Sequence, residues 1–205
     1  MFLSLSIMFL LILGVFKKNS SKLILNISVI ILLIGAVITF NETLGIGEVK
    51  LFNGSIVIDY LASFMKIITL LSAFLVLVVS SNYLKLLKIF KIEYPILILS
   101  SVLGMMIMIS SNDLIVFYMG LELQSLALYV LATFDRDKIK SSEAGLKYFV
   151  LSALSSGLLL YGCSLIYGFT GSTNFNEIAN QLNSNEYALT FGIVFILVGL
   201  AFKIS

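Results

Sequence analysis

A glutamate stands inside a long apolar stretch of the sequence, in the segment YMGLELQSLALYVL at residues 118–131. A charge near the middle of a membrane helix costs roughly 2.5–3.5 kcal/mol even on the mildest insertion scale, so such residues are rare and usually functional. Counted along a helix, Glu122 lies about 14 Å from one end of its apolar segment and about 18 Å from the other. Its carboxylate therefore cannot reach either headgroup layer.

Three lysines also remain at membrane depth, namely Lys66, Lys147 and Lys203. Lys203 lies about 22 Å along its helix from Ala188, and Lys147, entering from the opposite side, comes to a similar level. Lys147 also follows Glu143 by four residues, the spacing of an ordinary helix ion pair. Lys66 lies about two turns inside its helix, where a lysine can extend to the headgroups, so it is the weaker candidate.

Packing of the three helices that carry Glu122, Lys147 and Lys203 would bring ionisable groups of opposite sign together inside a bundle. A lysine in apolar surroundings holds its proton weakly, and a nearby carboxylate strengthens that hold. At an effective dielectric constant near 20, closing such a pair to about 4 Å gains about 4 kcal/mol. We therefore predict a buried proton relay, with a protonated, hydrogen-bonded structural glutamate as the alternative.

The composition is that of a polytopic membrane protein. Of the 205 residues, 60% are hydrophobic and 12% are charged, whereas a soluble domain has about 25% charged residues. The net charge of +2 is too small to indicate a nucleic-acid surface. Membrane lipids are the expected surroundings.

The sequence offers few ligands for a metal or a redox cofactor. It contains no histidine, one cysteine and no Cys-x-x-Cys pair, so nothing suits zinc, haem or an iron–sulfur centre. Cys163 has apolar neighbours and reads as a packing residue. We expect no cofactor in this chain and place any redox chemistry in a partner.

The expected fold class is all-α, with about seven transmembrane helices, because seven apolar segments approach the roughly 20 residues that span a bilayer. They lie at 2–16, 23–40, 60–81, 95–111, 114–134, 145–168 and 188–204. The stretch GSTNFNEIANQLNSNE at 171–186 suggests a short amphipathic surface helix. Residues 1–94 form an N-terminal group of three helices, and residues 95–205 a second unit.

Basic residues between the segments predict the orientation. Nine lie in the loops after the first, third and fifth segments: Lys17, Lys18, Lys22, Lys85, Lys88, Lys91, Arg136, Lys138 and Lys140. In the alternate loops, Lys50 is the only basic residue. By the positive-inside rule, the N-terminus faces outward. In the sixth segment, Ala153 and Gly157, with serines beside them, predict close helix packing.

Residues 95–205 closely resemble NADH dehydrogenase subunit 2 of mitochondrial respiratory complex I, whose bacterial counterpart is subunit N. The resemblance rests on GLELQSLALYVL and EAGLKYFVLSALSSG, and on GLAFKIS near residue 205. Residues 1–94 match only in their helix pattern.

The resemblance implies an antiporter-like fold built from inverted repeats, of which this sequence is an N-terminal portion. It implies that Glu122, Lys147 and Lys203 form one proton half-channel, while quinone is reduced elsewhere in the complex. The other membrane-arm subunits are the implied partners. The implied location is the mitochondrial inner membrane, with the N-terminus in the intermembrane space and the basic loops in the matrix; a bacterial plasma membrane is the alternative.

The family pattern continues beyond FKIS into further helices, whereas this sequence stops at Ser205. The sequence is then either one piece of a split subunit, whose remainder a second chain carries, or a truncated product, and we expect the split. Two other functions fit the buried charges. They are a component of a multisubunit cation/proton antiporter, and a purely structural membrane subunit whose charges hold helices in register.

Overall fold

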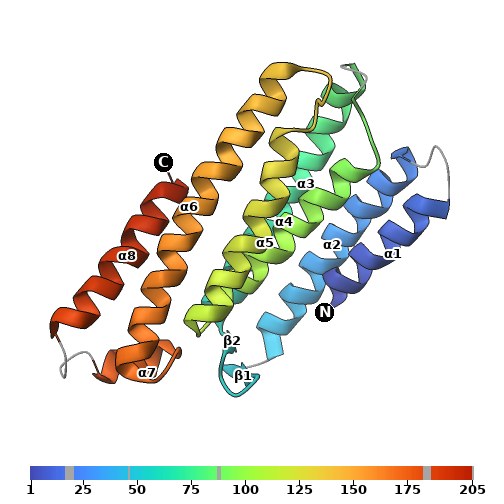
Figure 1. The fold of residues 1–205 in the computed structure, drawn as a ribbon. Coiled ribbons are helices and arrows are strands. Elements are labelled where there is room, and N and C mark those ends of the chain that lie inside the picture. Colours follow the sequence, from blue (N-terminus) through green and yellow to red (C-terminus); the bar gives the residue numbers. More distant parts are fainter. Residues whose placement is uncertain (17–20, 46, 87–88, 182–185, 205) are drawn as a thin grey trace.

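The structure, a computed structural model, describes residues 1–16, 21–45, 47–86, 89–181 and 186–204 (Figure 1). These residues form a bundle of helices with one small β-hairpin. The elements in chain order are α1 (Phe2–Phe16), α2 (Ser21–Gly45), β1 (Val49–Leu51), β2 (Ile56–Ile58), α3 (Tyr60–Leu86), α4 (Glu93–Ile109), α5 (Leu114–Ala132), α6 (Ile139–Thr170), α7 (Phe175–Gln181) and α8 (Glu186–Ile204).

The seven predicted segments correspond to α1 to α6 and α8, which confirms the all-α membrane architecture. Helices α2, α3, α5 and α6 are long and apolar enough to span a membrane, and α1, α4 and α8 contain shorter apolar stretches. The expected surface helix is α7. The antiparallel pairing of β1 with β2, in the predicted loop at 41–59, was not foreseen from the sequence.

Local sequence signals fix several helix ends. Asp113 begins α5 as an N-cap, because its Oδ1 accepts the backbone N–H of Ile115 at 2.8 Å. Helix α6 ends at Gly171, whose φ of +68° is the left-handed C-cap conformation that glycine adopts without steric cost. Pro95 lies in the first turn of α4, where its missing N–H removes no helix bond.

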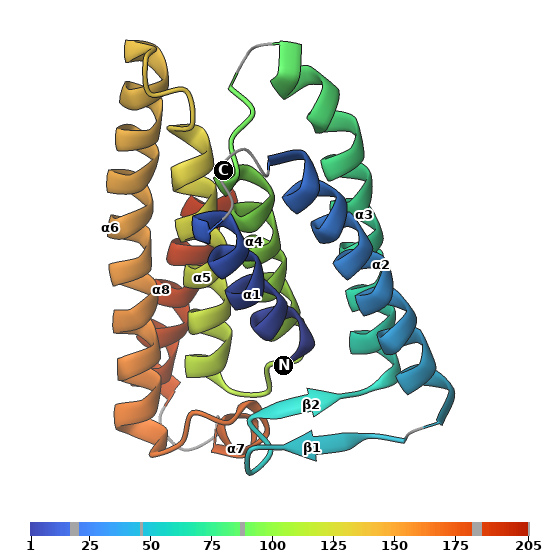
Figure 2. The same ribbon diagram turned by 90° about the vertical axis from the view of Figure 1, so that its right-hand side faces the viewer.

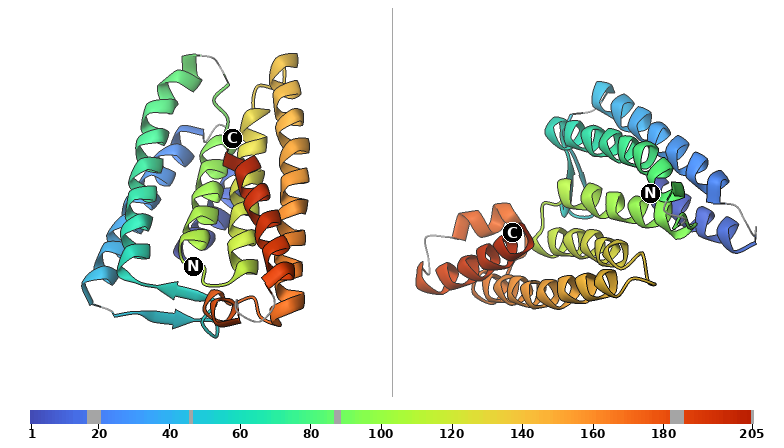
Figure 3. Two further views of the ribbon diagram at one scale, coloured as in Figure 1. Left: turned by 90° about the vertical axis from the view of Figure 1, so that its left-hand side faces the viewer. Right: turned by 90° about the horizontal axis from the view of Figure 1, so that it is seen from above.

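The long helices form two groups, visible from above in Figure 3. Helices α1 to α4 share one core, in which Leu10, Leu32, Leu70 and Leu99 are fully buried. Helices α5, α6 and α8 share a second core around Leu159. Helix α4 packs along α5 and thereby joins the two groups.

The bundle has two distinct ends (Figure 2). We call the end with β1, β2, α7 and the α4–α5 connection the hairpin end, and the end with the α3–α4 and α5–α6 connections the basic end. At the hairpin end, Asn112 donates from its side chain to the carbonyl of Gly54 at 3.0 Å. The Asn112 carbonyl accepts the N–H of Phe175. The α4–α5 connection therefore fastens the hairpin and the α7 segment together.

Candidate functional site

The site is built on an ion pair between α5 and α8. The Nζ of Lys203 donates to Oε1 of Glu122 at 2.6 Å. Only 9% of the Lys203 side chain and 21% of the Glu122 side chain are exposed. Two charges that are costly to bury singly are therefore buried against each other.

A serine from a third helix completes the site. Ser156 on α6 donates its hydroxyl hydrogen to the same Oε1 of Glu122 that accepts the lysine. Hydrogen bonds to a charged group are stronger than those between neutral groups, so both donors hold the Glu122 side chain in place. Glu122 is thus bound from α6 and α8 at once.

Glycines allow α8 to approach α6 closely enough for this contact. A Cβ on Gly162 of α6 would lie 2.8 Å from the carbonyl oxygen of Gly192, and one on Gly199 of α8 would lie 2.8 Å from Cβ of Leu159. Small residues permit such close approach of membrane helices, so these glycines position the C-terminal end of α8. Figure 1 shows that α8 ends part-way along α6, which places Lys203 within the bundle's length.

Lys147 does not join the ion pair. Its Nζ contacts Glu143 of the same helix at 2.6 Å, and 68% of its side chain is exposed. It lies nine residues before Ser156, or about 14 Å along α6. Of the three charges expected to meet, the structure brings two into contact, and the third forms the helix pair that its spacing allowed.

Lys66 lies near the hairpin end, on α3. It lines a cavity of about 290 Å³ together with Thr39, Glu42 and Ser110, and it forms no ion pair with any residue that the structure describes. Lys66 is not in contact with the Glu122–Lys203 pair.

Some polar groups of the site were not identified from the sequence. Ser156 was predicted only as a packing residue, and its position beside the glutamate depends on the rotation of α6 relative to α5. Outside the ion pair, α5 also carries Gln124 and Tyr129, whose Oε1 and hydroxyl atoms are buried without a hydrogen-bond partner in the described part of the chain. Their polarity within an apolar helix was the available signal.

The arrangement supports proton transfer at the pair itself. Separating the two groups would leave each charge without its partner in apolar surroundings, which is unfavourable. Buried ionisable pairs between membrane helices are typical of ion and proton pathways. The Ser156 hydroxyl, which donates to the carboxylate, keeps lone pairs free to accept from a water or an ammonium.

The described residues contain no group of three His, Cys, Asp or Glu side chains that could hold a metal ion. Cys163 is buried and packs with Leu159 and Ile166 in the α5–α6–α8 core. Its position is that of a packing residue.

Comparison with known proteins shows extensive similarity. The family model described as "NADH:quinone oxidoreductase/Mrp antiporter, TM" matches residues 111–205. NADH-quinone oxidoreductase subunit N of Pelagibacter ubique is 69% identical over 204 residues, which cover 100% of this chain and 43% of the relative. Subunit N of Maricaulis maris is 53% identical over 201 residues, covering 97% of this chain and 42% of the relative.

The fold is also shared with a solved structure. "Respiratory complex I from Thermus thermophilus with bound Aureothin" contains a chain that superposes with a TM-score of 0.82 at 25% identity, covering 98% of this chain and 43% of that one. The chain thus spans about two fifths of the length of the curated relatives it matches.

Proposed function

Because the chain is homologous to part of subunit N of NADH-quinone oxidoreductase and has the antiporter-like fold, we propose that it is a membrane-arm component of that enzyme and carries part of a proton path. The Glu122–Lys203 contact is the observation that carries this proposal. It is a buried pair of opposite charges at mid-depth, joined by a serine hydroxyl from a third helix. Burying ionisable residues inside a membrane costs free energy. Residues of this kind are therefore rare and usually mark a path for ions or protons.

Lys147 is the proposed group that exchanges protons between this pair and the basic end. It lies on α6 between Ser156 and the start of that helix, about 12 Å from Ile139. Its exposed side chain does not reach Glu122, so water or groups from a partner would have to connect them. Lys66 is a further candidate near the hairpin end.

We propose that this chain holds no cofactor and no site for NADH or quinone. The absence of histidine and the single, buried cysteine support this. Its contribution to the oxidoreductase would be conduction of protons, with electron transfer in other subunits.

The proposed location is the bacterial plasma membrane, because the relatives named above are bacterial. The mitochondrial inner membrane, expected from the first resemblance, is the alternative. The positive-inside rule favours the basic end on the cytoplasmic side, and the matrix is the corresponding side in a mitochondrion.

We propose that the exposed apolar side chains of α8 contact the part of subunit N that the relatives have beyond the matched region. Phe191, Leu197 and Phe202 are 65%, 60% and 52% exposed, and about three fifths of the length of the matched relatives lies outside this alignment. A second chain that supplies this remainder is our proposal. Mass spectrometry of the purified enzyme tests it by searching for a separate subunit that continues the relatives' sequence.

The proposed function is tested by measuring proton translocation in the assembled enzyme. We expect Lys203→Met and Glu122→Gln each to lower the protons moved per NADH oxidised, while electron transfer persists. Lys140→Met, which removes an exposed lysine from the first turn of α6, is the matched control and should pump normally. Normal pumping by both site variants in a fully assembled enzyme would refute the proposal.

The second candidate is a cation/proton antiporter component, because the matching family model includes Mrp antiporters. Sodium-dependent proton exchange in vesicles without NADH or quinone would favour it. The third, a purely structural subunit, would be indicated by poor assembly but normal pumping per assembled enzyme when the charges are removed.

A further inference from the structure

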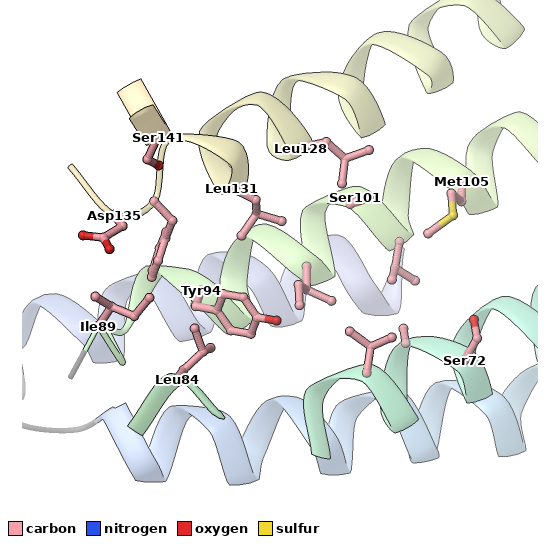
Figure 4. Close-up of a pocket in the computed structure, with 15 residues that line it drawn as sticks. Ser72, Leu84, Ile89, Tyr94, Ser101, Met105, Leu128, Leu131, Asp135 and Ser141 are labelled. Atoms are coloured by element: carbon pink, nitrogen blue, oxygen red, sulfur yellow. The ribbon is translucent and has the colours of Figure 1, made fainter. Parts of the chain in front are cut away.

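A separate cavity of about 510 Å³ lies between α3, α4 and α5, away from the Glu122–Lys203 pair (Figure 4). Its walls are mainly apolar and include Val76, Ile98, Val102, Leu128 and Leu131. The volume is typical of protein sites that hold a small ligand.

The cavity runs along the helices from the basic end toward the bundle interior. Figure 4 shows Ile89 and Asp135 at one extremity and Met105 and Ser72 at the other. Ile89 belongs to the α3–α4 connection and Asp135 to the α5–α6 connection, so the first extremity is at the basic end. The space is therefore elongated parallel to the helices, as an acyl chain is in a bilayer.

Two lysines lie beside residues that line this extremity. Lys85 is on the last turn of α3, directly after the lining residue Leu84, and its Nζ lies 5.6 Å from the ring centre of Phe90. Lys138 precedes α6, and its Nζ contacts Asp135 at 2.8 Å. Asp135 uses one of the three ammonium hydrogens of Lys138 and leaves the others available.

Lys138 is held in its cationic form at neutral pH. The hydrogen bond from Lys138 to Asp135 raises the pKa of that lysine, and Tyr83 on α3 is close enough to contribute electrostatically. Asp135 offsets one of the two lysine charges, so Lys85, Lys138 and Asp135 together present one net positive charge to an anionic group at this extremity.

We propose that this cavity binds one acyl chain of an anionic phospholipid whose phosphate lies between Lys85 and Lys138. The apolar walls accommodate the chain, and the two ammonium groups select the headgroup charge. A zwitterionic lipid would place its own cation beside these lysines and would bind less well. The lipid would fill the space between α3 and the α4–α5 pair and hold the two walls together.

The absence of tryptophan from the sequence provides a direct test. Met105→Trp puts the only indole at the deep extremity of the cavity, and Val79→Trp puts it on α3 at a site that is 73% exposed to the surroundings. The full 205-residue chain is reconstituted in phosphatidylcholine vesicles that contain a small fraction of chain-brominated phosphatidylglycerol or brominated phosphatidylcholine. Bromine quenches indole fluorescence on contact.

We expect quenching of the Met105→Trp protein to be several-fold stronger with brominated phosphatidylglycerol than with brominated phosphatidylcholine. Val79→Trp should be quenched equally by both. Adding Lys85→Gln and Lys138→Gln to Met105→Trp should abolish the difference. Leu128→Trp provides a second reporter on another wall should Met105→Trp fail to fold.

Equal quenching of the cavity reporter by the two lipids would overturn the anionic preference. Cavity reporters that neither lipid quenches, beside a quenched Val79→Trp, would show that lipid does not enter the cavity. Either result would reject the proposal, and neither depends on proton translocation.

Discussion

Lys203 and Glu122 are 81 residues apart in sequence, yet their charged groups are 2.6 Å apart. The contact is made by the last turn of α8 and the middle of α5, two helices that both also pack on α6. Because the pair is mostly buried, each charge depends on the other for its stability. This mutual dependence leads to the first prediction.

A single substitution in the Glu122–Lys203 pair should lower the free energy of unfolding more than the double substitution does. Removing one partner of a buried ion pair destabilises a protein by about 3–5 kcal/mol, whereas removing both leaves no unpaired charge. We expect Lys203→Met alone to be destabilising and Glu122→Gln with Lys203→Met to be closer to wild type. Unfolding of the detergent-solubilised chain by a denaturing detergent measures this. Additive effects would contradict the contact.

Ser156→Ala should weaken the site by removing one donor to the Glu122 carboxylate. A hydrogen bond to a charged group contributes about 1.5–3 kcal/mol, and we expect a loss in the lower part of this range. Ser164→Ala is the matched control, because Ser164 is on the same helix and donates only to the carbonyl of Tyr161. Equal unfolding free energies for the two variants would argue against the Ser156–Glu122 bond.

Much of the fold could be predicted from the sequence because apolar length alone defines a membrane helix. The structure has a helix at each of the seven predicted segments, and the expected surface helix is α7. Helix α6 begins at Ile139, six residues before the predicted start, since the polar residues that precede its apolar stretch continue the helix. The β-hairpin was missed because its strands have only three residues each.

The site could be predicted only in part, for a geometric reason. The presence of Glu122, Lys147 and Lys203 at membrane depth made a meeting of all three charges expected. The rotation of α6 about its axis was not encoded in any local pattern, and it decides that Ser156 faces Glu122 while Lys147 is exposed. That rotation is fixed by contacts such as Gly162 against Gly192, which become visible only in three dimensions.

Gly162→Ala should separate α8 from α6. The added Cβ would lie 2.8 Å from the Gly192 carbonyl oxygen, which is backbone and cannot move independently. Overpacking of this kind costs about 1–3 kcal/mol. Gly157→Ala is the control on the same helix, because nothing lies within 4 Å of its added Cβ. A cysteine crosslink between α6 and α8 should form less readily in Gly162→Ala only; unchanged crosslinking would contradict the close packing.

Lys147→Gln should reduce proton translocation without lowering the stability of the fold. Its bond to Glu143 is an exposed pair four residues apart, and such pairs contribute about 0.3–0.5 kcal/mol. We expect almost unchanged unfolding but reduced proton translocation in the assembled enzyme. Glu143→Gln removes the same ion pair while leaving the lysine, and it should translocate nearly normally. Equal transport defects in both variants would indicate that the ion pair matters rather than the lysine's proton.

Asp113→Ala should loosen the hairpin end, because the Asp113 side chain joins two segments. One carboxylate oxygen accepts the N–H of Ile115 in the first turn of α5, and the other accepts the Thr173 hydroxyl hydrogen at 2.5 Å. Loss of such a cap costs about 0.5–2 kcal/mol. Hydrogen exchange should therefore accelerate in the first turn of α5 and around Thr173. Asp113→Asn keeps an oxygen that can cap the helix, so hydrogen exchange in the first turn of α5 should stay slow. Exchange around Thr173 should still accelerate, because the bond to its hydroxyl is weakened. Faster exchange in α5 for both variants would contradict this assignment of the two oxygens.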